Sequence, residues 1–198
     1  MLPDRITAEK ELEAAAKMNP GPWIMHSRNA AMAAERIAAA CGMDSERAYI
    51  LGLLHDIGRR EGINATKHIT DGYHYAVSKG WNDVARACLT HSFPIQDINA
   101  MIGQSDIPPH DREFLADYIK QAKYSDYDLL IILCDSIALP QGFCILEKRF
   151  IDTSIRYGIY DFLPERWQKY YDYKAYFEHK CGKNLYSLLP GIEKCIYW

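Results

Sequence analysis

Histidine and aspartate side chains at the ends of apolar segments are the residues of this sequence best suited to chemistry. The stretch AYILGLLHDIGRREG, residues 48–62, is apolar until it reaches His55 and Asp56. Asp135 interrupts the stretch LLIILCDSIAL, whose helix we expect to be buried because it is apolar nearly all round. An ionised carboxylate removed from water costs several kcal/mol unless its charge is compensated. An ion pair or a helix end would compensate Asp135 alone, whereas a metal cation would compensate both carboxylates and also accept the imidazole of His55.

Three further histidines extend this set of possible metal ligands. His26 lies in the first turns of a small, apolar helical segment, and His68 and His91 lie toward opposite ends of two consecutive helical segments. Taken singly, a histidine such as His26 is better explained as a hydrogen-bonded core residue. Taken together, imidazole nitrogens and carboxylate oxygens suit iron, manganese, zinc or nickel and disfavour a structural zinc–thiolate site.

The elements that must position these residues are predicted to be helices throughout. Pro22 and Gly42 bracket the first predicted helix, and Asp44 is the expected N-cap of the second. No alternation typical of strands with hairpin turns is found, so the fold class predicted is all-α. The helices are expected over about 22–41, 45–57, 68–79, 82–91, 111–123, 126–139, 144–157 and 164–181.

Composition excludes several classes of protein. The 198 residues are 48 % hydrophobic and 25 % charged, the balance of an ordinary globular protein. The net charge of −3 argues against a nucleic-acid duplex as partner, because a duplex binder usually has a basic excess. The first twenty residues do not form a signal peptide, and no apolar run reaches the length of about 18 residues that a membrane span needs. The six cysteines form no C-x-x-C pair, so we expect a reduced, cytoplasmic protein that does not bind a membrane.

The pattern His26 … His55–Asp56 … Asp135 on an all-helical chain, together with the string LLHDIGR, resembles the HD superfamily of metal-dependent phosphohydrolases. The resemblance covers roughly residues 20–140. It implies an HD-domain helical bundle with a metal site between its central helices. The ligands of the first metal implied by this resemblance are His26, His55, Asp56 and Asp135.

Two further segments, KHITDGYHYAVSKG and ARACLTHS, are similar to the branch of that superfamily that binds two metals. By this resemblance His68 and His91 hold a second ion and Asp56 bridges the two. The branch includes hydrolases of dinucleoside tetraphosphates, cyclic-dinucleotide hydrolases and a few iron oxygenases. The Gly-Tyr-Pro marker of the cyclic-dinucleotide group is absent, since residues 72–74 read GYH, and this disfavours a cyclic dinucleotide.

The function implied is hydrolysis of a phosphate ester or anhydride in a small phosphorylated substrate, which we expect to be a nucleotide. Water activated by two divalent cations would attack, with Asp56 and Asp135 as the catalytic aspartates and Asp135 orienting the water. Iron, manganese, zinc, nickel, cobalt and magnesium are not distinguished by these ligands. Arg59 lies one helical turn after Asp56 and is expected to contact substrate phosphate; the alternative is a solvated cation favoured by the helix end.

Two rival functions use the same residues. One is a di-iron oxygenase of the same fold, which would consume O₂. The other is a non-catalytic sensor that binds a nucleotide and metal without turnover. Residues 1–140 are predicted to form the HD-type metal-binding domain, and residues 141–198 an aromatic-rich helical extension packed on it. Most of those aromatics are expected to be packing residues, with one or two at the mouth of the pocket, and a homodimer is left open.

Overall fold

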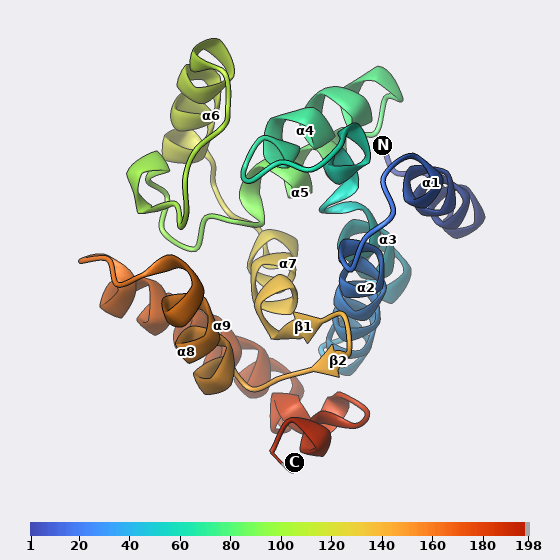
Figure 1. Cartoon of the computed structure of the whole chain (residues 1–198). Coiled ribbons are helices and arrows are strands. Elements are labelled where there is room, and N and C mark those ends of the chain that lie inside the picture. Colours follow the sequence, from blue (N-terminus) through green and yellow to red (C-terminus); the bar gives the residue numbers. More distant parts are fainter. Residues whose placement is uncertain (197–198) are drawn as a thin grey trace.

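The protein, described here by a computed structural model over residues 1–196, is a bundle of helices with one minimal β-hairpin (Figure 1). The prediction of an all-α fold is confirmed. Short 3₁₀ helices (η) join several of the longer ones. In chain order the elements are α1 (Arg5–Met18), α2 (Trp23–Ala40), α3 (Ser45–Leu54), η1 (Ile57–Glu61), α4 (His68–Ser78), α5 (Asn82–Thr90), η2 (Ile98–Ala100), α6 (Pro109–Gln121), α7 (Asp126–Ile137), β1 (Ala138–Leu139), β2 (Gly142–Phe143), α8 (Leu146–Tyr157), α9 (Leu163–Cys181), η3 (Leu185–Leu188) and η4 (Ile192–Cys195).

Helix boundaries follow the capping residues of the sequence. Asp44 caps α3 as predicted, its carboxylate accepting a hydrogen bond from the Arg47 backbone N–H at 3.0 Å. Gly42 takes a left-handed backbone conformation, with φ of 67°, between α2 and α3. Ser125 and Asp128 form a capping box at the start of α7. These local signals therefore decide where the central helices begin and end.

Close packing of α2 against α3 depends on small residues. The buried face of α2 is rich in alanine, and α3 presents Gly52 to it. A Cβ atom on Gly52 would lie 2.8 Å from the Cα of Ala31 and 2.9 Å from the carbonyl oxygen of Ala30. The two backbones can approach this closely only because Gly52 has no side chain.

Two local predictions from the sequence need correction. The helix expected to continue to Leu139 ends at Ile137, and the chain forms a two-residue antiparallel hairpin in which Ala138 pairs with Phe143. The second strand begins at Gly142, directly after the turn, with φ of 136°, a conformation that favours glycine. The other correction is α1, which the sequence analysis did not propose. Its N-cap is Asp4, whose carboxylate accepts from the Thr7 N–H at 2.7 Å.

The helix α7 lies at the centre of the molecule, between α2 and α3 on one side and α8 and α9 on the other (Figure 1). One hydrophobic cluster runs from α1 through these helices to Leu189, so the C-terminal helices share the core of the bundle. A smaller cluster lies beneath α6 and includes Leu89, Phe93 and Leu115.

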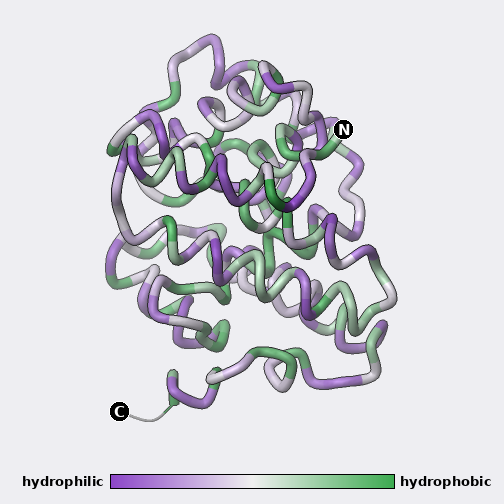
Figure 2. Tube along the Cα trace, turned by 90° about the vertical axis from the view of Figure 1, so that its right-hand side faces the viewer, coloured by the Kyte–Doolittle hydropathy of each residue, from purple (hydrophilic) through white to green (hydrophobic). Residues whose placement is uncertain are grey.

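The division into a metal-binding domain and a C-terminal extension at residue 140 stays a prediction. Polar and apolar residues are mixed along most of the trace (Figure 2), and none of the described helices is long and apolar enough to cross a membrane.

Candidate metal centre

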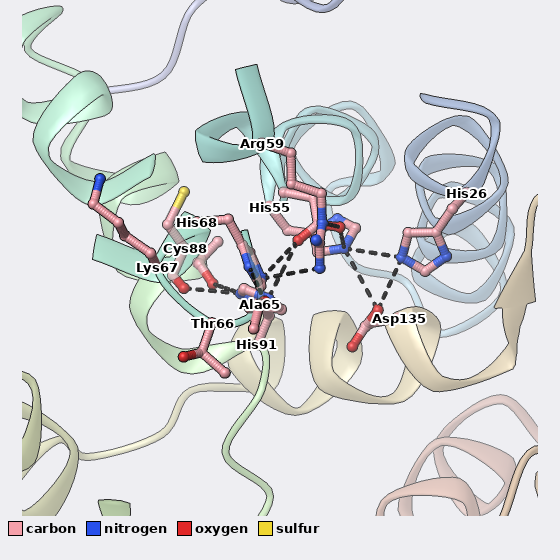
Figure 3. A network of polar contacts seen from close by, with 12 residues as sticks. His26, His55, Arg59, Ala65, Thr66, Lys67, His68, Cys88, His91 and Asp135 are labelled. Atoms are coloured by element: carbon pink, nitrogen blue, oxygen red, sulfur yellow. Dashed lines mark hydrogen bonds and ion pairs between the residues drawn. The ribbon is translucent and has the colours of Figure 1, made fainter. Parts of the chain in front are cut away.

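Six histidine and aspartate side chains, carried in or just after five helices, meet at α7. Figure 3 labels all of them except Asp56. All six stand at or near a helix end, and four of them, His55, Asp56, His68 and His91, lie at the end itself or just beyond it. All six are the residues singled out in the sequence: His26 in the first turn of α2, His55 and Asp56 after α3, His68 at the start of α4, His91 after α5, and Asp135 in the last turns of α7.

The first cluster surrounds Asp135. The Nε2 atom of His26 lies 2.9 Å from Oδ1 of Asp135, and the Nε2 atom of His55 lies 3.6 Å from the same oxygen. The two Nε2 atoms are 3.3 Å apart. One ligand atom from each of the three residues lies within 4.8 Å of the others, a spacing that a single metal ion can span.

The second cluster surrounds Asp56. Its Oδ1 atom lies 3.1 Å from Nε2 of His68 and 3.6 Å from Nε2 of His91. Its Oδ2 atom lies 3.9 Å from Nε2 of His55. Asp56 thus faces both clusters with different oxygens, which is the position that a bridging ligand would need.

Hydrogen bonds to backbone carbonyls fix the orientation of all four imidazoles. A carbonyl oxygen only accepts, so each Nδ1 atom bonded to one must carry the proton. The Nε2 atoms then carry lone pairs, and all four face the two carboxylates. The Nδ1–H groups donate to Ala138 from His26 (3.1 Å), to Gly52 from His55 (2.7 Å), to Ala65 from His68 (3.0 Å) and to Cys88 from His91 (2.8 Å).

This arrangement fits a divalent cation. Lone pairs of His26 and His55 face each other at 3.3 Å, which is unfavourable without a positive charge between them. The buried Oδ1 atom of Asp56 accepts no hydrogen bond from any described residue. A histidine whose second nitrogen donates to a backbone carbonyl is the usual arrangement of a metal ligand. His26, His55, Asp56, His68, His91 and Asp135 are therefore the residues that would hold metal.

The electrostatics of the cluster favour the ligand forms of the carboxylates. Burial would raise the pKa of Asp56, but the Arg59 guanidinium, and the surrounding imidazoles when they are protonated, hold that pKa well below its ordinary value. The pKa of Asp135 is likewise held well below its ordinary value, against burial, by hydrogen bonds and charge from His26 and His55 when these are protonated; a bound cation would supply the positive charge in their place. Burial lowers the pKa of His91 to about 3, with a smaller contribution from His55. For His55 the carboxylates Asp56 and Asp135 outweigh burial and raise the pKa, so this site attracts positive charge.

Arg59 lies among the ligands. Its Nε–H donates to Oδ2 of Asp56 at 2.6 Å, and its Nη2 atom lies 3.3 Å from Nε2 of His68. The guanidinium also lines the pocket that opens onto the cluster. The expected contact with substrate phosphate stays a prediction. The alternative of a solvated helix-end cation does not hold, because Arg59 makes an ion pair with a buried carboxylate.

Glycine at position 58 allows α4 to approach the centre. A Cβ atom on Gly58 would lie 2.1 Å from the carbonyl oxygen of His68 and 2.3 Å from the backbone nitrogen of Gly72. Any side chain here would push α4 away, and with it the imidazole of His68. Gly58 thus contributes to the site by allowing two backbone segments to pack closely, although it provides no metal ligand.

Two carboxylates that sequence reasoning missed hold ligand-bearing segments in place. Asp106 accepts hydrogen bonds at 2.7 Å from the backbone N–H groups of Ala65, Thr66 and Lys67, immediately before His68. Asp128 accepts from the Arg86 guanidinium and, at 3.0 Å, from the hydroxyl of Thr90, immediately before His91. No short motif reveals either contact, since the partners lie about 40 residues apart along the chain.

The pocket beside the metal centre has a volume of about 380 Å³. The prediction that only one or two aromatics of the C-terminal segment reach it underestimates their number. Four of them line it, because α8 and α9 pack against α7, the helix that carries Asp135 (Figure 1). These aromatics are Phe150, Tyr157, Trp167 and Tyr170.

Of three comparisons with known proteins, one identifies the family of the chain and two find no match. A family model described as "HD domain" matches residues 23–138, which is more than half of the chain and contains all six candidate ligands. No curated protein and no solved structure matches the chain. The matched region ends just after α7, so α8 and α9 lie outside it.

Proposed function

Given that this chain belongs to the HD domain family, whose members are mostly metal-dependent hydrolases, we propose that it hydrolyses a phosphate ester or anhydride of a small substrate. The substrate that we propose is a nucleotide. One observation carries the proposal: four imidazole nitrogens, the buried carboxylate of Asp56 and the half-buried carboxylate of Asp135 converge at the wall of a pocket.

The chemistry needs a divalent cation and ligands held ready for it. When bound, such cations lower the pKa of a water molecule from 15.7 to about 7 and neutralise charge on phosphoryl oxygens. The residues of this chain supply the rest. Asp135 and Asp56 are kept ionised by their neighbours and are the proposed catalytic aspartates, with Asp135 orienting the attacking water. Arg59 is placed to pair with a phosphate oxygen at the edge of the same cluster.

Two metal ions are proposed because the ligands form two groups that share Asp56. His26, His55 and Asp135 would complete the first group, whose ligand atoms lie within 4.8 Å of one another. His68 and His91 would complete the second, since both face Oδ1 of Asp56. His55 lies between the groups, because its ligand atom is also within 4.8 Å of those of Asp56 and His91. Iron, manganese, zinc, nickel, cobalt and magnesium stay equivalent as candidates, since selection among them depends on availability as well as ligands.

A nucleotide fits the dimensions and lining of the pocket. Small-molecule sites usually have volumes of about 300–1,000 Å³, and this pocket is at the lower end of that range. Trp167 lines it and offers an aromatic face on which a base can stack.

The absence of disulfides among the cysteines Cys41, Cys88, Cys134, Cys144, Cys181 and Cys195 supports a cytoplasmic location.

Elemental analysis of metal stoichiometry is the test of this function, on protein purified without oxygen or chelator. We expect two equivalents per chain, falling toward one in His68→Ala and toward none in Asp135→Ala. His74→Ala is the matched control, because His74 is exposed and pairs with Asp111 away from the centre. The metal-loaded protein should then release inorganic phosphate from at least one nucleotide.

The other outcomes separate the rival functions. One equivalent that is unaffected by His68→Ala would show a mononuclear site. Iron with O₂ uptake and no release of phosphate would identify an oxygenase. Tight nucleotide binding without turnover would identify a sensor, and no metal in any sample would overturn the proposal.

A further inference from the structure

The wall of the pocket that α8 and α9 contribute carries charge of one sign. The acidic residues lining the pocket are Asp56 and Asp135, and both belong to the metal centre. Outside the centre, every charged side chain among the described residues that line it is an arginine: Arg149, Arg156 and Arg166. This wall lies outside the region matched by the family model.

Arg166, on α9, is buried without a counter-charge. Only 8 % of the residue is exposed. Its guanidinium donates to the carbonyl oxygens of Ser92 (3.2 Å) and Ala100 (3.2 Å) and to the hydroxyl of Tyr170 (3.3 Å). These acceptors are neutral, so among the described residues the guanidinium forms hydrogen bonds but no direct ion pair. A buried charge of this kind is costly unless an opposite charge reaches it.

Arg149, on α8, has free donors at the same pocket. Its side chain is 23 % exposed, and its one ion-pair partner among the described residues is Asp152, at 3.7 Å. That carboxylate is already engaged by Arg156 at 2.6 Å. Among the described residues the nearest acceptor of the Arg149 guanidinium is thus Asp152 at 3.7 Å, beyond hydrogen-bond distance, which leaves its fork of N–H groups available to a ligand.

The buried phenol of Tyr170 links this wall to the metal centre. Burial raises the pKa of Tyr170, the charges of Arg166 and Arg149 oppose that effect, and the charge of Asp135 adds to it. Arg166 donates to this hydroxyl at 3.3 Å, and Arg149 and Asp135 line the same pocket. A ligand that fills the pocket from the metal centre therefore has both arginines in the wall around it.

We propose that Arg149 and Arg166 form a second anion subsite, which takes a phosphate group of the substrate other than the one attacked at the metal centre. Arg149 supplies the bidentate hydrogen bonds that a guanidinium forms with phosphate oxygens. Arg166 supplies a positive charge that is not taken up in a direct ion pair, and it holds the segments of Ser92 and Ala100 against α9. This inference rests on the proposed function for the attacked group, and it narrows the substrate to compounds with phosphates at two separate positions.

The test compares two ligands that differ only in the second phosphate, adenosine 5′-monophosphate and adenosine 3′,5′-bisphosphate. Their dissociation constants are measured by calorimetry on metal-loaded protein, and turnover is followed as phosphate release. We expect the wild type to bind the bisphosphate at least tenfold more tightly, as one charged hydrogen-bonded contact would give. In Arg149→Met this ratio should fall to about one, with binding of the monophosphate unchanged.

Arg36→Met is the matched control, because Arg36 is exposed on α2 and does not line the pocket; it should keep the wild-type ratio. Arg149→Met should fold, since Asp152 keeps its ion pair with Arg156. If it does not, Arg149→Lys keeps the charge without the fork and should give an intermediate ratio. A ratio near one in the wild type, or the same ratio in the Arg149 variants, would overturn the subsite. Tighter binding of the bisphosphate without phosphate release, whichever metal is loaded, would support the subsite but contradict the proposed hydrolysis.

Discussion

The guanidinium of Arg59 donates from Nε to Oδ2 of Asp56 at 2.6 Å, in the middle of the candidate ligands. The same group lies 3.3 Å from Nε2 of His68. A cation held by Asp56 and His68 would therefore meet the positive charge of Arg59 at close range, and both would compete for the same carboxylate.

From this relationship we predict that Arg59→Met binds the second metal ion roughly tenfold more tightly than the wild type, because a repelling charge is removed. Calorimetric titration of chelator-treated protein with Mn²⁺ would measure both binding steps. Arg36→Met should bind both ions like the wild type. Weaker binding of the second ion in Arg59→Met would show the reverse, namely that Arg59 holds Asp56 in the orientation that the metal needs.

A second prediction concerns Gly58, whose missing side chain lets α4 approach the centre. Gly58→Ala should lower the free energy of unfolding by about 3 kcal/mol, since its Cβ would collide with backbone atoms of His68 and Gly72 that cannot move separately. Urea unfolding measures this loss. Gly80→Ala, with φ of 72° but no atom within 4 Å of its Cβ, should cost only about 1 kcal/mol. Equal losses in the two variants would mean that α4 yields easily to the added methyl group.

The central part of the site could be predicted from the sequence because its signals are local. Polar residues that interrupt apolar helices, such as His55 and Asp135, must be compensated, and a cluster of them limits the ways in which this can be done. Helix-capping residues such as Asp44 and Gly42 are also local signals, since a cap acts on residues within one turn.

Contacts between distant segments could not be predicted from one sequence. Nothing near Asp106 or Arg166 in the chain indicates the backbone groups that each one binds, 40 and 74 residues away. The orientation of Arg59 toward Asp56, inside the cluster, depends on the 3₁₀ turn that replaces a regular helix after His55. The hairpin after Ile137 depends on tertiary packing, because two-residue strands carry no periodic pattern.

A third prediction follows from Asp106, which holds the backbone before His68. Its partial burial would raise the pKa of Asp106, but hydrogen bonds from three backbone N–H groups outweigh this and lower it from 3.8 to about 2. The lowered pKa means that the folded state favours the ionised carboxylate. The stabilisation is therefore complete above about pH 4 and is lost as the pH falls toward 2.

Asp106→Asn should accordingly unfold at a lower urea concentration than the wild type at pH 6, and the difference should narrow steadily below pH 4. It should also bind the second ion more weakly, because the loop carrying Ala65, the hydrogen-bond acceptor of His68, loses its anchor. Asp161→Asn, at an exposed position, should change neither property. A difference that stays constant from pH 6 to pH 3 would show that the charge of Asp106 does not stabilise the fold.

The last prediction concerns the buried ion pair beside His91. Asp128 is 4 % exposed and accepts from Arg86 at 2.9 Å, from the Thr90 hydroxyl and from the backbone of Ser125. Arg86→Met leaves this carboxylate without its counter-charge and should lower the free energy of unfolding by about 3 kcal/mol.

Adding Asp128→Asn to Arg86→Met should recover part of that loss, because the double variant no longer buries an uncompensated charge and the new amide can still bond to Thr90. Urea unfolding of the four proteins in the cycle measures the coupling. Strictly additive losses would contradict the assignment of Arg86 as the partner that makes Asp128 tolerable in the core. If Arg86→Met binds metal more weakly and the double variant does not regain stability, the ion pair instead acts by holding the backbone that carries His91.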